Sequence, residues 1–209
     1  MVKVKICGIC HEAEIGIMNE LNPDYVGFVF ISKSRHFIAP EHAGLLRSKL
    51  RRGIQSVGVF ANSSLKSVAM CAEVAGLDLI QLHGNETGEY IAALREYTRC
   101  KIMKVYRVAS QIDAEKAMFS TADYVMLDGG SAGDGKIFNW SLIGKLHRKY
   151  FLSGGLNPDN VEQALALDSQ PYALNVNSGV EVNRTKDYRK VMKFISSVRN
   201  FKGQKAVSI

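Results

Sequence analysis

The run Tyr124-Val125-Met126-Leu127 ends on a carboxylate, Asp128, and the chain then enters a segment rich in glycine. These glycines are Gly129, Gly130, Gly133 and Gly135. A short apolar run of this kind predicts a buried strand, and the glycines predict a loop after it. Glycine lets backbone N–H groups approach an anion, because no Cβ intervenes and positive φ is allowed. The stretch therefore indicates an acid delivered to an anion-binding loop, although a flexible connector fits these residues equally well.

Short β-like runs followed by amphipathic helical runs recur along the whole chain. The expected strands are 2–7, 25–30, 56–60, 79–83, 101–105, 124–127, 150–153 and 172–176. The expected helices are 11–21, 40–50, 65–75, 87–97, 112–119, 141–147, 158–167 and 187–198. Proline at the first helical position marks two of the starts, at Pro40 and Pro158. Eight such units predict the α/β class and a (β/α)₈ TIM barrel, with residues 1–209 as one catalytic domain.

Composition favours one ordinary globular domain. The chain has 209 residues, of which 46% are hydrophobic and 22% charged, which suits one domain. No apolar run approaches the roughly 20 residues of a membrane span, so we expect neither a signal peptide nor a membrane helix. The four cysteines are too few and too irregularly spaced for a disulfide framework, which indicates a reducing cytoplasm.

The net charge of +7 is compatible with nucleic acid or with an acidic small molecule. Most lysines and arginines are scattered, and those of residues 47–52 and 186–205 alternate with apolar residues at helical spacing. Such spacing is typical of solvated helix faces. We therefore expect no nucleic-acid partner, while a non-catalytic nucleic-acid-binding barrel stays the alternative from another class.

Strand ends should hold the chemistry, because the active face of a (β/α)₈ barrel lies at the carboxyl ends of its strands. Alternation in the first strand puts Lys5 inside the barrel and Cys7 at its mouth. Asp128 ends the sixth strand, so a thiol and a carboxylate would face one another. Alternation in the eighth strand turns the amides of Asn175 and Asn177 inward.

Two more glycine turns lead towards expected helix starts. They begin at Ser153-Gly154-Gly155, after the seventh strand, and at Ser178-Gly179, after the eighth. Phosphate sites of this architecture commonly form at that place, where free N–H groups favour an anion.

A series of short motifs, taken in order, gives the chain a family resemblance. They are Lys5-Ile6-Cys7-Gly8-Ile9, Val26-Gly27-Phe28-Val29-Phe30, Val57-Gly58-Val59-Phe60, Gln81-Leu82-His83-Gly84, Leu127-Asp128, Gly135-Lys136, Ser153-Gly154-Gly155-Leu156-Asn157-Pro158-Asp159-Asn160-Val161 and Ser178-Gly179-Val180-Glu181. From residue 3 to about residue 199 the chain resembles phosphoribosylanthranilate isomerases of tryptophan biosynthesis.

The resemblance implies an Amadori rearrangement of N-(5-phosphoribosyl)anthranilate to 1-(2-carboxyphenylamino)-1-deoxyribulose 5-phosphate, without a cofactor or metal. Such a reaction needs a general acid and a general base, and the resemblance implies Asp128 as the acid and Cys7 as the base. The implied ligands of the substrate carboxylate are Arg35 or His36, and Asn175 lies at the position near its amino group. The implied phosphate site contains Gly133, Gly135, Gly154, Gly155, Ser178 and Gly179.

Three departures from the family pattern put substrate affinity and substrate identity in question. His36 stands where an arginine is usual, Asn175 where an aspartate is usual, and Asp134 where a hydroxyl residue is common. A phosphosugar barrel with a different or lost substrate is therefore the alternative. The partner expected is a small phosphorylated molecule, and a monomer and a homodimer both stay open. A redox role for Cys7-Gly8-Ile9-Cys10 is disfavoured, because eight βα units do not suit a thioredoxin-like fold.

Overall fold

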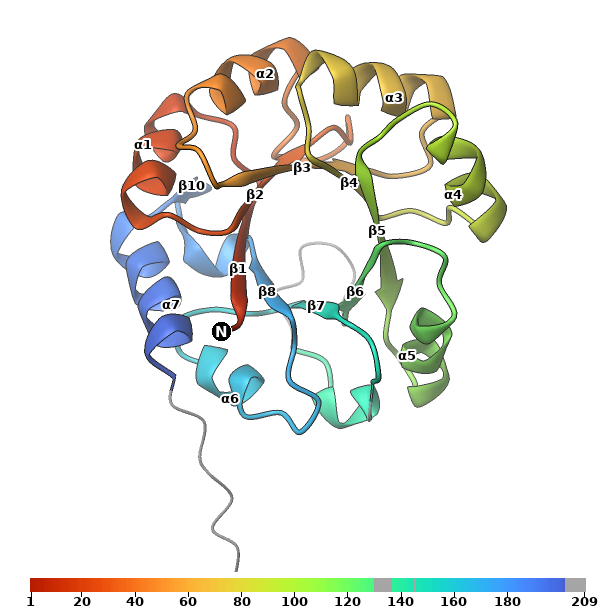
Figure 1. Ribbon diagram of the computed structural model, residues 1–209. Coiled ribbons are helices and arrows are strands. Elements are labelled where there is room, and N and C mark those ends of the chain that lie inside the picture. The colour runs from red at the N-terminus through yellow and green to blue at the C-terminus, as the bar shows by residue number, and fades with distance from the viewer. Residues whose placement is uncertain (130–136, 145, 202–209) are drawn as a thin grey trace, which may run out of the picture.

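The computed structural model describes residues 1–129, 137–144 and 146–201, and within them eight parallel strands close into a barrel. Figure 1 looks along the barrel and shows the strands as an inner ring with the helices outside it. Every strand pairs in parallel with the next one along the chain, and β8 pairs with β1. The predicted (β/α)₈ barrel is confirmed.

The strands have the bounds β1 Lys3–Cys7, β2 Tyr25–Val29, β3 Gln55–Phe60, β4 Leu79–Leu82, β5 Lys101–Arg107, β6 Tyr124–Asp128, β7 Tyr150–Ser153 and β8 Ala173–Val176. The helices are α1 Glu12–Leu21, α2 Pro40–Ser48, α3 Leu65–Val74, α4 Gly88–Arg95, α5 Gln111–Met118, α6 Val161–Leu165 and α7 Tyr188–Asn200. Two 3-10 turns, η1 Trp140–Ile143 and η2 Ser178–Val180, and a short antiparallel hairpin, β9 Glu181–Val182 with β10 Thr185–Lys186, complete the fold.

Alternation along the strands divides the apolar residues into two layers, as it does in any sheet covered on both faces. Outward-facing residues form the large core between the strands and the helices. Inward-facing residues form a separate cluster that fills the barrel: Tyr25, Val57, Leu79, Met103, Val105, Met126, Phe151 and Ala173. The barrel is therefore packed at its amino-terminal end, and any substrate must approach from the opposite end.

Aromatic rings occlude the amino-terminal end. The ring of Phe151 meets those of Tyr25, Tyr124 and Tyr172 edge to face, with centroids 5.3 to 5.7 Å apart. Aromatic pairs of this geometry stabilise beyond the area they bury. The Lys3 ammonium lies 5.5 Å from the ring centre of Tyr25 and so covers the cluster from outside.

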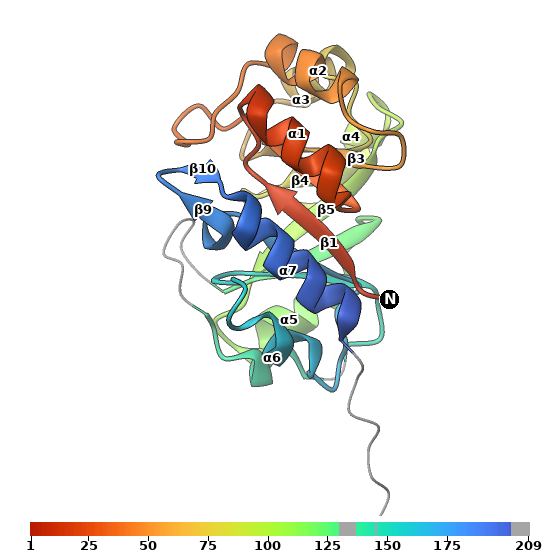
Figure 2. The ribbon, with the colours of Figure 1, turned by 90° about the vertical axis from the view of Figure 1, so that its left-hand side faces the viewer.

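The last helix packs where the barrel closes. In Figure 2, α7 runs beside α1 and β1, so segments far apart in sequence lie side by side. Its inward stripe is apolar and comprises Val191, Phe194, Ile195 and Val198. Spacings of three and four residues put these side chains on one face of a helix. Burial of that stripe holds the carboxyl-terminal helix against the first βα unit.

Two local predictions were wrong, and one element was missed. Residues 141–147 do not form the expected helix, since their described part holds only the 3-10 turn η1. Asn139 accepts a hydrogen bond from the backbone N–H of Ser141, and Gly144 then takes a φ of 58°, which ends the turn. The helix expected over 158–167 is confined to Val161–Leu165. The hairpin of β9 and β10 was not expected, because two-residue strands carry no periodic signal.

No helix among the described residues is long and apolar enough to cross a membrane.

Replacing Phe151 by alanine tests the packing of the barrel interior. The side chain is fully buried, so we expect the variant to lose about 3–5 kcal/mol of unfolding free energy through lost burial and the cavity left behind. Phe119→Ala is the matched control, because that ring is 84% exposed and should change stability by less than about 0.5 kcal/mol. Urea denaturation followed by circular dichroism measures both, and equal losses would contradict a packed interior.

Candidate active site

Cys7 and Asp128 lie at one rim of the barrel. Cys7 is the last residue of β1 and Asp128 the last residue of β6, and all eight strands run parallel. Their side chains therefore share the carboxyl-terminal mouth, as the sequence predicted. The Cys7 thiol is 6% exposed and packs with Val29 and Val59. Gly27 leaves room for it, since a Cβ there would lie 2.6 Å from Cys7 Sγ.

Asp128 has one hydrogen-bonding neighbour on the adjacent strand β7 and a histidine nearby, after β4. The hydroxyl of Ser153, at the end of β7, donates to Asp128 Oδ2 at 2.9 Å. His83 Nε2, from the segment after β4, lies 4.0 Å from the same oxygen. The carboxyl side chain is 15% exposed, so it stays open to the mouth while these groups orient it.

His83 favours the neutral form. Burial lowers the pKa of the imidazole, and the positive charges of Lys5, Arg107 and Lys104 act in the same direction. The Asp128 carboxylate opposes this shift without reversing it. Beside Asp128 the site thus holds a neutral imidazole, which serves as a polar neighbour and adds no positive charge at neutral pH.

The middle of the barrel contains a charge. Lys5 is completely buried, as predicted, and its ammonium donates to Asn175 Oδ1 at 2.8 Å. Asn175 Nδ2 in turn donates to Ser153 Oγ at 3.0 Å. A buried charge requires hydrogen-bond partners, and Asn175 supplies one here from the strand directly paired with β1.

The glycine turns after β7 and β8 are in contact. Gly154 and Gly155 have φ values of 97° and 67°, a region that suits glycine. A Cβ on Gly179 would overlap the carbonyl oxygen of Leu156, so the two turns touch there. A Cβ on Gly154 would lie 2.9 Å from the backbone nitrogen of Gly129, which brings the start of the β6 loop to the same place. Ser178 and Gly179 lie in η2, beside these turns.

Part of the predicted phosphate loop lies outside the described residues, namely Gly133, Asp134 and Gly135. The described flank of that loop is anchored by Phe138, which is 9% exposed. A Cβ on Gly129 would overlap the Phe138 side chain, so the ring packs directly on the glycine. This contact fixes the chain immediately after Asp128.

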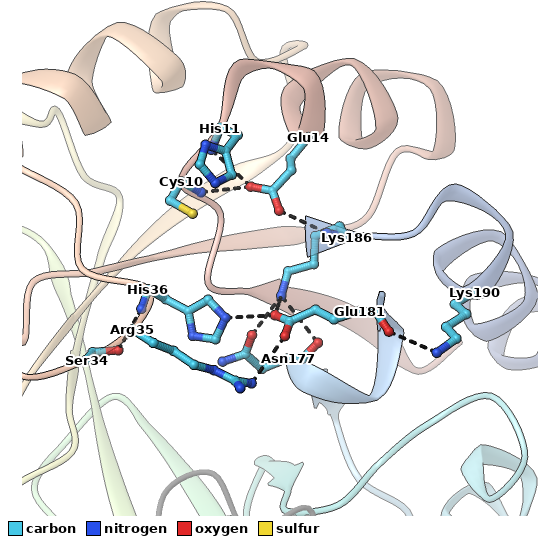
Figure 3. Close-up of polar contacts among 10 residues, drawn as sticks. All are labelled: Cys10, His11, Glu14, Ser34, Arg35, His36, Asn177, Glu181, Lys186 and Lys190. Carbon is cyan, nitrogen blue, oxygen red and sulfur yellow. Dashed lines mark hydrogen bonds and ion pairs between the residues drawn. The ribbon is translucent and has the colours of Figure 1, made fainter. Parts of the chain in front are cut away.

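Arg35 and His36, the predicted ligands of the substrate carboxylate, both contact Glu181 (Figure 3). His36 Nε2 lies 2.8 Å from Glu181 Oε1, and its side chain is 5% exposed. Arg35 Nη2 lies 3.2 Å from Glu181 Oε2, and its side chain is 45% exposed. The structure therefore holds His36 inside the protein and leaves Arg35 at the surface of the mouth.

Glu181 is the centre of an ion cluster at the β8–α7 connection. Lys186 Nζ, fully buried, lies 2.5 Å from Glu181 Oε1 and 2.7 Å from Asn177 Oδ1. Burial alone would raise the pKa of the Glu181 carboxyl, but the hydrogen bonds and charges of His36 and Lys186 outweigh it and lower the pKa to about 2. Glu181 is consequently ionised throughout the physiological range.

Glu14 extends this cluster to the first helix. Its Oε2 accepts hydrogen bonds from the backbone N–H groups of Cys10 and His11, at 2.9 and 3.0 Å, which caps α1. Its Oε1 accepts from the backbone N–H of Lys186 at 3.0 Å. Figure 3 shows Glu14 and Glu181 on either side of Lys186.

Lys104, in the middle of the fifth strand, contributes to a loop and not to the barrel interior. Its neighbours Met103 and Val105 face inward, so Lys104 faces outward. The ammonium lies 3.1 Å from Glu86 Oε2 and donates to the carbonyl oxygen of Gly84 at 2.6 Å. This buried pair fixes the turn that follows His83.

Cys7, Cys10, Cys71 and Cys100 are all free thiols. Within the described ranges, no group of three or more histidine, cysteine, aspartate or glutamate side chains could hold a metal ion.

Sequence reasoning missed Ser153, Glu181 and Lys186 as parts of the site. Ser153 could have been predicted as a site residue, because it ends the expected strand β7, and the structure makes it the register partner of Asp128. Glu181 and Lys186 could not, since Glu181 matters through contacts with Arg35 and His36, which are distant in sequence, and Lys186 through its contact with Glu181.

A closed parallel barrel with an acid, a thiol and glycine turns at its carboxyl-terminal mouth is the architecture of enzymes of the (β/α)₈ class. Residues 4–197 match the N-(5'-phosphoribosyl)anthranilate (PRA) isomerase family. The chain belongs to this family of isomerases.

Relatives of known name cover the whole chain. The N-(5'-phosphoribosyl)anthranilate isomerase of Thermoanaerobacter pseudethanolicus is 40% identical over 208 residues, covering 97% of this chain and 100% of the relative. That of Clostridium acetobutylicum is 40% identical over 210 residues, with the same coverage. The crystal structure of the Thermotoga maritima enzyme superimposes with a TM-score of 0.88 at 36% identity, covering 96% of this chain and 100% of the other.

A further solved structure contains a bound molecule. It is a phosphoribosylanthranilate isomerase in complex with reduced 1-(o-carboxyphenylamino)-1-deoxyribulose 5-phosphate, and it superimposes with a TM-score of 0.85 at 35% identity. It covers 96% of this chain, and the match covers 100% of that structure.

The lowered pKa of Glu181 predicts how stability changes in acid. The pKa falls from 4.5 to about 2 on folding, so the carboxylate stabilises the fold above about pH 4.5 and this contribution is lost as pH falls towards 2. Its size is on the order of 3 kcal/mol. We expect Glu181→Gln to be less stable than wild type at pH 7 and to show a flatter decline between about pH 5 and pH 2.

Urea denaturation at stepped pH measures this decline. Glu96→Gln, at an exposed position that ends α4, is the control and should keep the wild-type slope. A wild-type slope in Glu181→Gln would show that the ion cluster does not stabilise the fold.

Proposed function

We propose that this chain catalyses the Amadori rearrangement of N-(5'-phosphoribosyl)anthranilate, with Asp128 as general acid and Cys7 as general base. The observation that carries the proposal is the placement of both side chains at one barrel rim, at the ends of β6 and β1, beside the glycine turns. Membership of the isomerase family supports the same reaction.

The chemistry requires two proton transfers by these side chains, one to the furanose ring oxygen and one from C2. Asp128 gives a proton to the furanose ring oxygen as the bond from C1 to that oxygen breaks, and the amine nitrogen supplies the electron pair that forms an iminium ion. The Cys7 thiolate then removes the proton on C2, and the C2–H electrons form the C1–C2 double bond of an enolamine. Uptake of a proton at C1 and loss of the C2 hydroxyl proton give the aminoketose.

Backbone N–H groups are the proposed phosphate ligands, from Gly154, Gly155, Ser178 and Gly179. Their turns meet next to Asp128, where a phosphate would hold the sugar against the acid. Gly133 and Gly135 complete the proposed site from residues outside the described part of the chain. The relative bound to a reduced product analogue, itself a 5-phosphate, supports a phosphorylated small molecule as ligand.

Arg35 is the first candidate for the substrate carboxylate. Its guanidinium is nearly half exposed and makes one contact of 3.2 Å with Glu181, so it is able to turn towards a ligand. His36 is buried against Glu181 and would act mainly by holding that carboxylate in place. Asn175 stays a predicted neighbour of the substrate amino group.

Two wider expectations belong to the proposal. The domain is proposed to comprise residues 1–209, and the four free thiols fit the reducing cytoplasm expected from the sequence. No cofactor or metal takes part in the proposed reaction. A related structure is of monomers of the dimeric Thermotoga maritima enzyme, and for this chain a monomer and a homodimer are both left open.

His36 and Asn175 favour one alternative function, a phosphosugar barrel with a different or lost substrate. Both residues stand at positions expected to meet the substrate, where the chain departs from the family pattern. Parallel turnover of N-(5'-phosphoribosyl)anthranilate and of the aminoaldose substrate of histidine biosynthesis would separate the two functions.

Loss of either proton-transfer group tests the mechanism. We expect Cys7→Ala and Asp128→Asn each to lower kcat by about 10²- to 10⁴-fold with little change in KM, because the groups act in the transition state. The assay follows the loss of phosphoribosylanthranilate fluorescence. Cys10→Ala, three residues from Cys7, is the matched control and should keep wild-type kcat. Near-normal turnover of either variant would remove its assignment.

Arg35→Ala tests carboxylate recognition. A lost hydrogen bond to a charged group predicts a rise in KM of about ten- to hundred-fold with kcat little changed. Lys33→Ala removes an exposed cation from the same loop and serves as the control. An unchanged KM in Arg35→Ala would exclude Arg35 as the ligand.

A further inference from the structure

Four side chains from four strands form one continuous chain of hydrogen bonds across the barrel. It runs from Lys5 on β1 to Asn175 on β8, then to Ser153 on β7 and to Asp128 on β6, with steps of 2.8, 3.0 and 2.9 Å. Lys5, Asn175 and Ser153 are 0%, 7% and 5% exposed, so water cannot readily replace these partners. Among the four, the proposed reaction gives a proton-transfer role to Asp128 alone.

The four-residue chain of hydrogen bonds has a fixed order of donors and acceptors. An ammonium group can only donate, so Asn175 must turn its carbonyl oxygen to Lys5 and its NH₂ group to Ser153. The NH₂ group occupies a lone pair of Ser153 Oγ, and the hydroxyl hydrogen is then left for Asp128 Oδ2. Each donor lies on the lysine side of its acceptor. The amide of Asn175 thus determines that Ser153 donates to Asp128.

We propose that Ser153 is a positioning residue for the general acid, and that Asn175, oriented by Lys5, sets the direction of its hydroxyl. This proposal rests on the proposed function of Asp128. The hydroxyl holds the carboxyl group at the mouth and stabilises the carboxylate that remains once Asp128 has given its proton to the ring oxygen. Asn175 therefore acts on the acid through Ser153, in addition to any contact it makes with substrate.

An aspartate at position 175 would remove the NH₂ group that donates to Ser153 and would interrupt this order of donors and acceptors. A carboxylate offers acceptors only, so Lys5 would keep its partner, while Ser153 would have a single hydrogen to share between two carboxylates. Asp128 would then lose part or all of its hydrogen bond and gain a negative neighbour. Asparagine is the residue that lets the chain of donors continue from the ammonium to the acid.

Other charged or titratable groups lie near Asp128 and can affect the pH profile of the enzyme. Among the described residues they are His83 after β4, Arg107, which is the register partner of Asp128 on β5, and Lys5 on β1. Cys7 shares the same rim. A background variant, His83→Gln, shows whether a limb of the profile comes from the imidazole.

The test compares wild type, Ser153→Ala, Ser153→Thr and Asn175→Asp. Ser153→Ala should lower the maximal kcat by about ten- to hundred-fold with KM within about two-fold, because a hydrogen bond to a charged group is lost. The carboxylate loses the Ser153 donor, so the acid form persists to higher pH and the alkaline limb of the kcat–pH profile moves to higher pH. Asn175→Asp should move it in the same direction, and Ser153→Thr, which keeps the hydroxyl, should restore the wild-type limb.

A second measurement does not depend on turnover. The ¹³Cγ chemical shift of Asp128, followed against pH, should show a midpoint at higher pH in Ser153→Ala than in wild type and Ser153→Thr. An unmoved limb and an unmoved midpoint in Ser153→Ala and Asn175→Asp would overturn the proposal. Inactive wild-type protein with a moved midpoint would instead refute the proposed reaction and leave the coupling between the four residues standing.

Discussion

The pairing of β1 with β8 is the constraint on which the rest of the structure depends. It closes the sheet, brings Lys5 opposite Asn175 in the register, and sets the first strand beside the last strand of the barrel. Because a closed parallel barrel collects all strand ends on one rim, a thiol near residue 7 and a carboxylate near residue 128 share a mouth without any direct contact between their segments. Closure of the barrel therefore brings the two reactive side chains to the same rim.

Inside the barrel, one layer is apolar and the next is polar. Phe151 and the tyrosines around it occlude the amino-terminal end, whereas Lys5, Asn175 and Ser153 occupy the level below the mouth. A buried ammonium is costly unless it is hydrogen-bonded, and here its partners lead towards Asp128. The same group thus serves the fold by filling the barrel and serves the site by orienting the acid.

Sequence patterns predicted the strands and the acid–thiol pair because both depend on short-range periodicity. Alternation in 2–7 placed Lys5 inside, and the apolar run before Asp128 ended where the strand ends. The expected helix at 141–147 failed because a few residues of helical spacing do not outweigh a turn capped by Asn139. The partner of His36 could not be predicted, since Glu181 lies 145 positions away and no local pattern links the two.

The two contacts of Glu14 affect when the first helix can dock as the polypeptide is synthesised. One of its oxygens caps α1, and the other binds the backbone of Lys186, so the first helix shares a carboxylate with a hairpin translated 172 positions later. A nascent chain presents that oxygen to water until Lys186 has been synthesised. Full docking of the first helix thus waits for the hairpin, and a product stalled before Lys186 would lack this hydrogen bond.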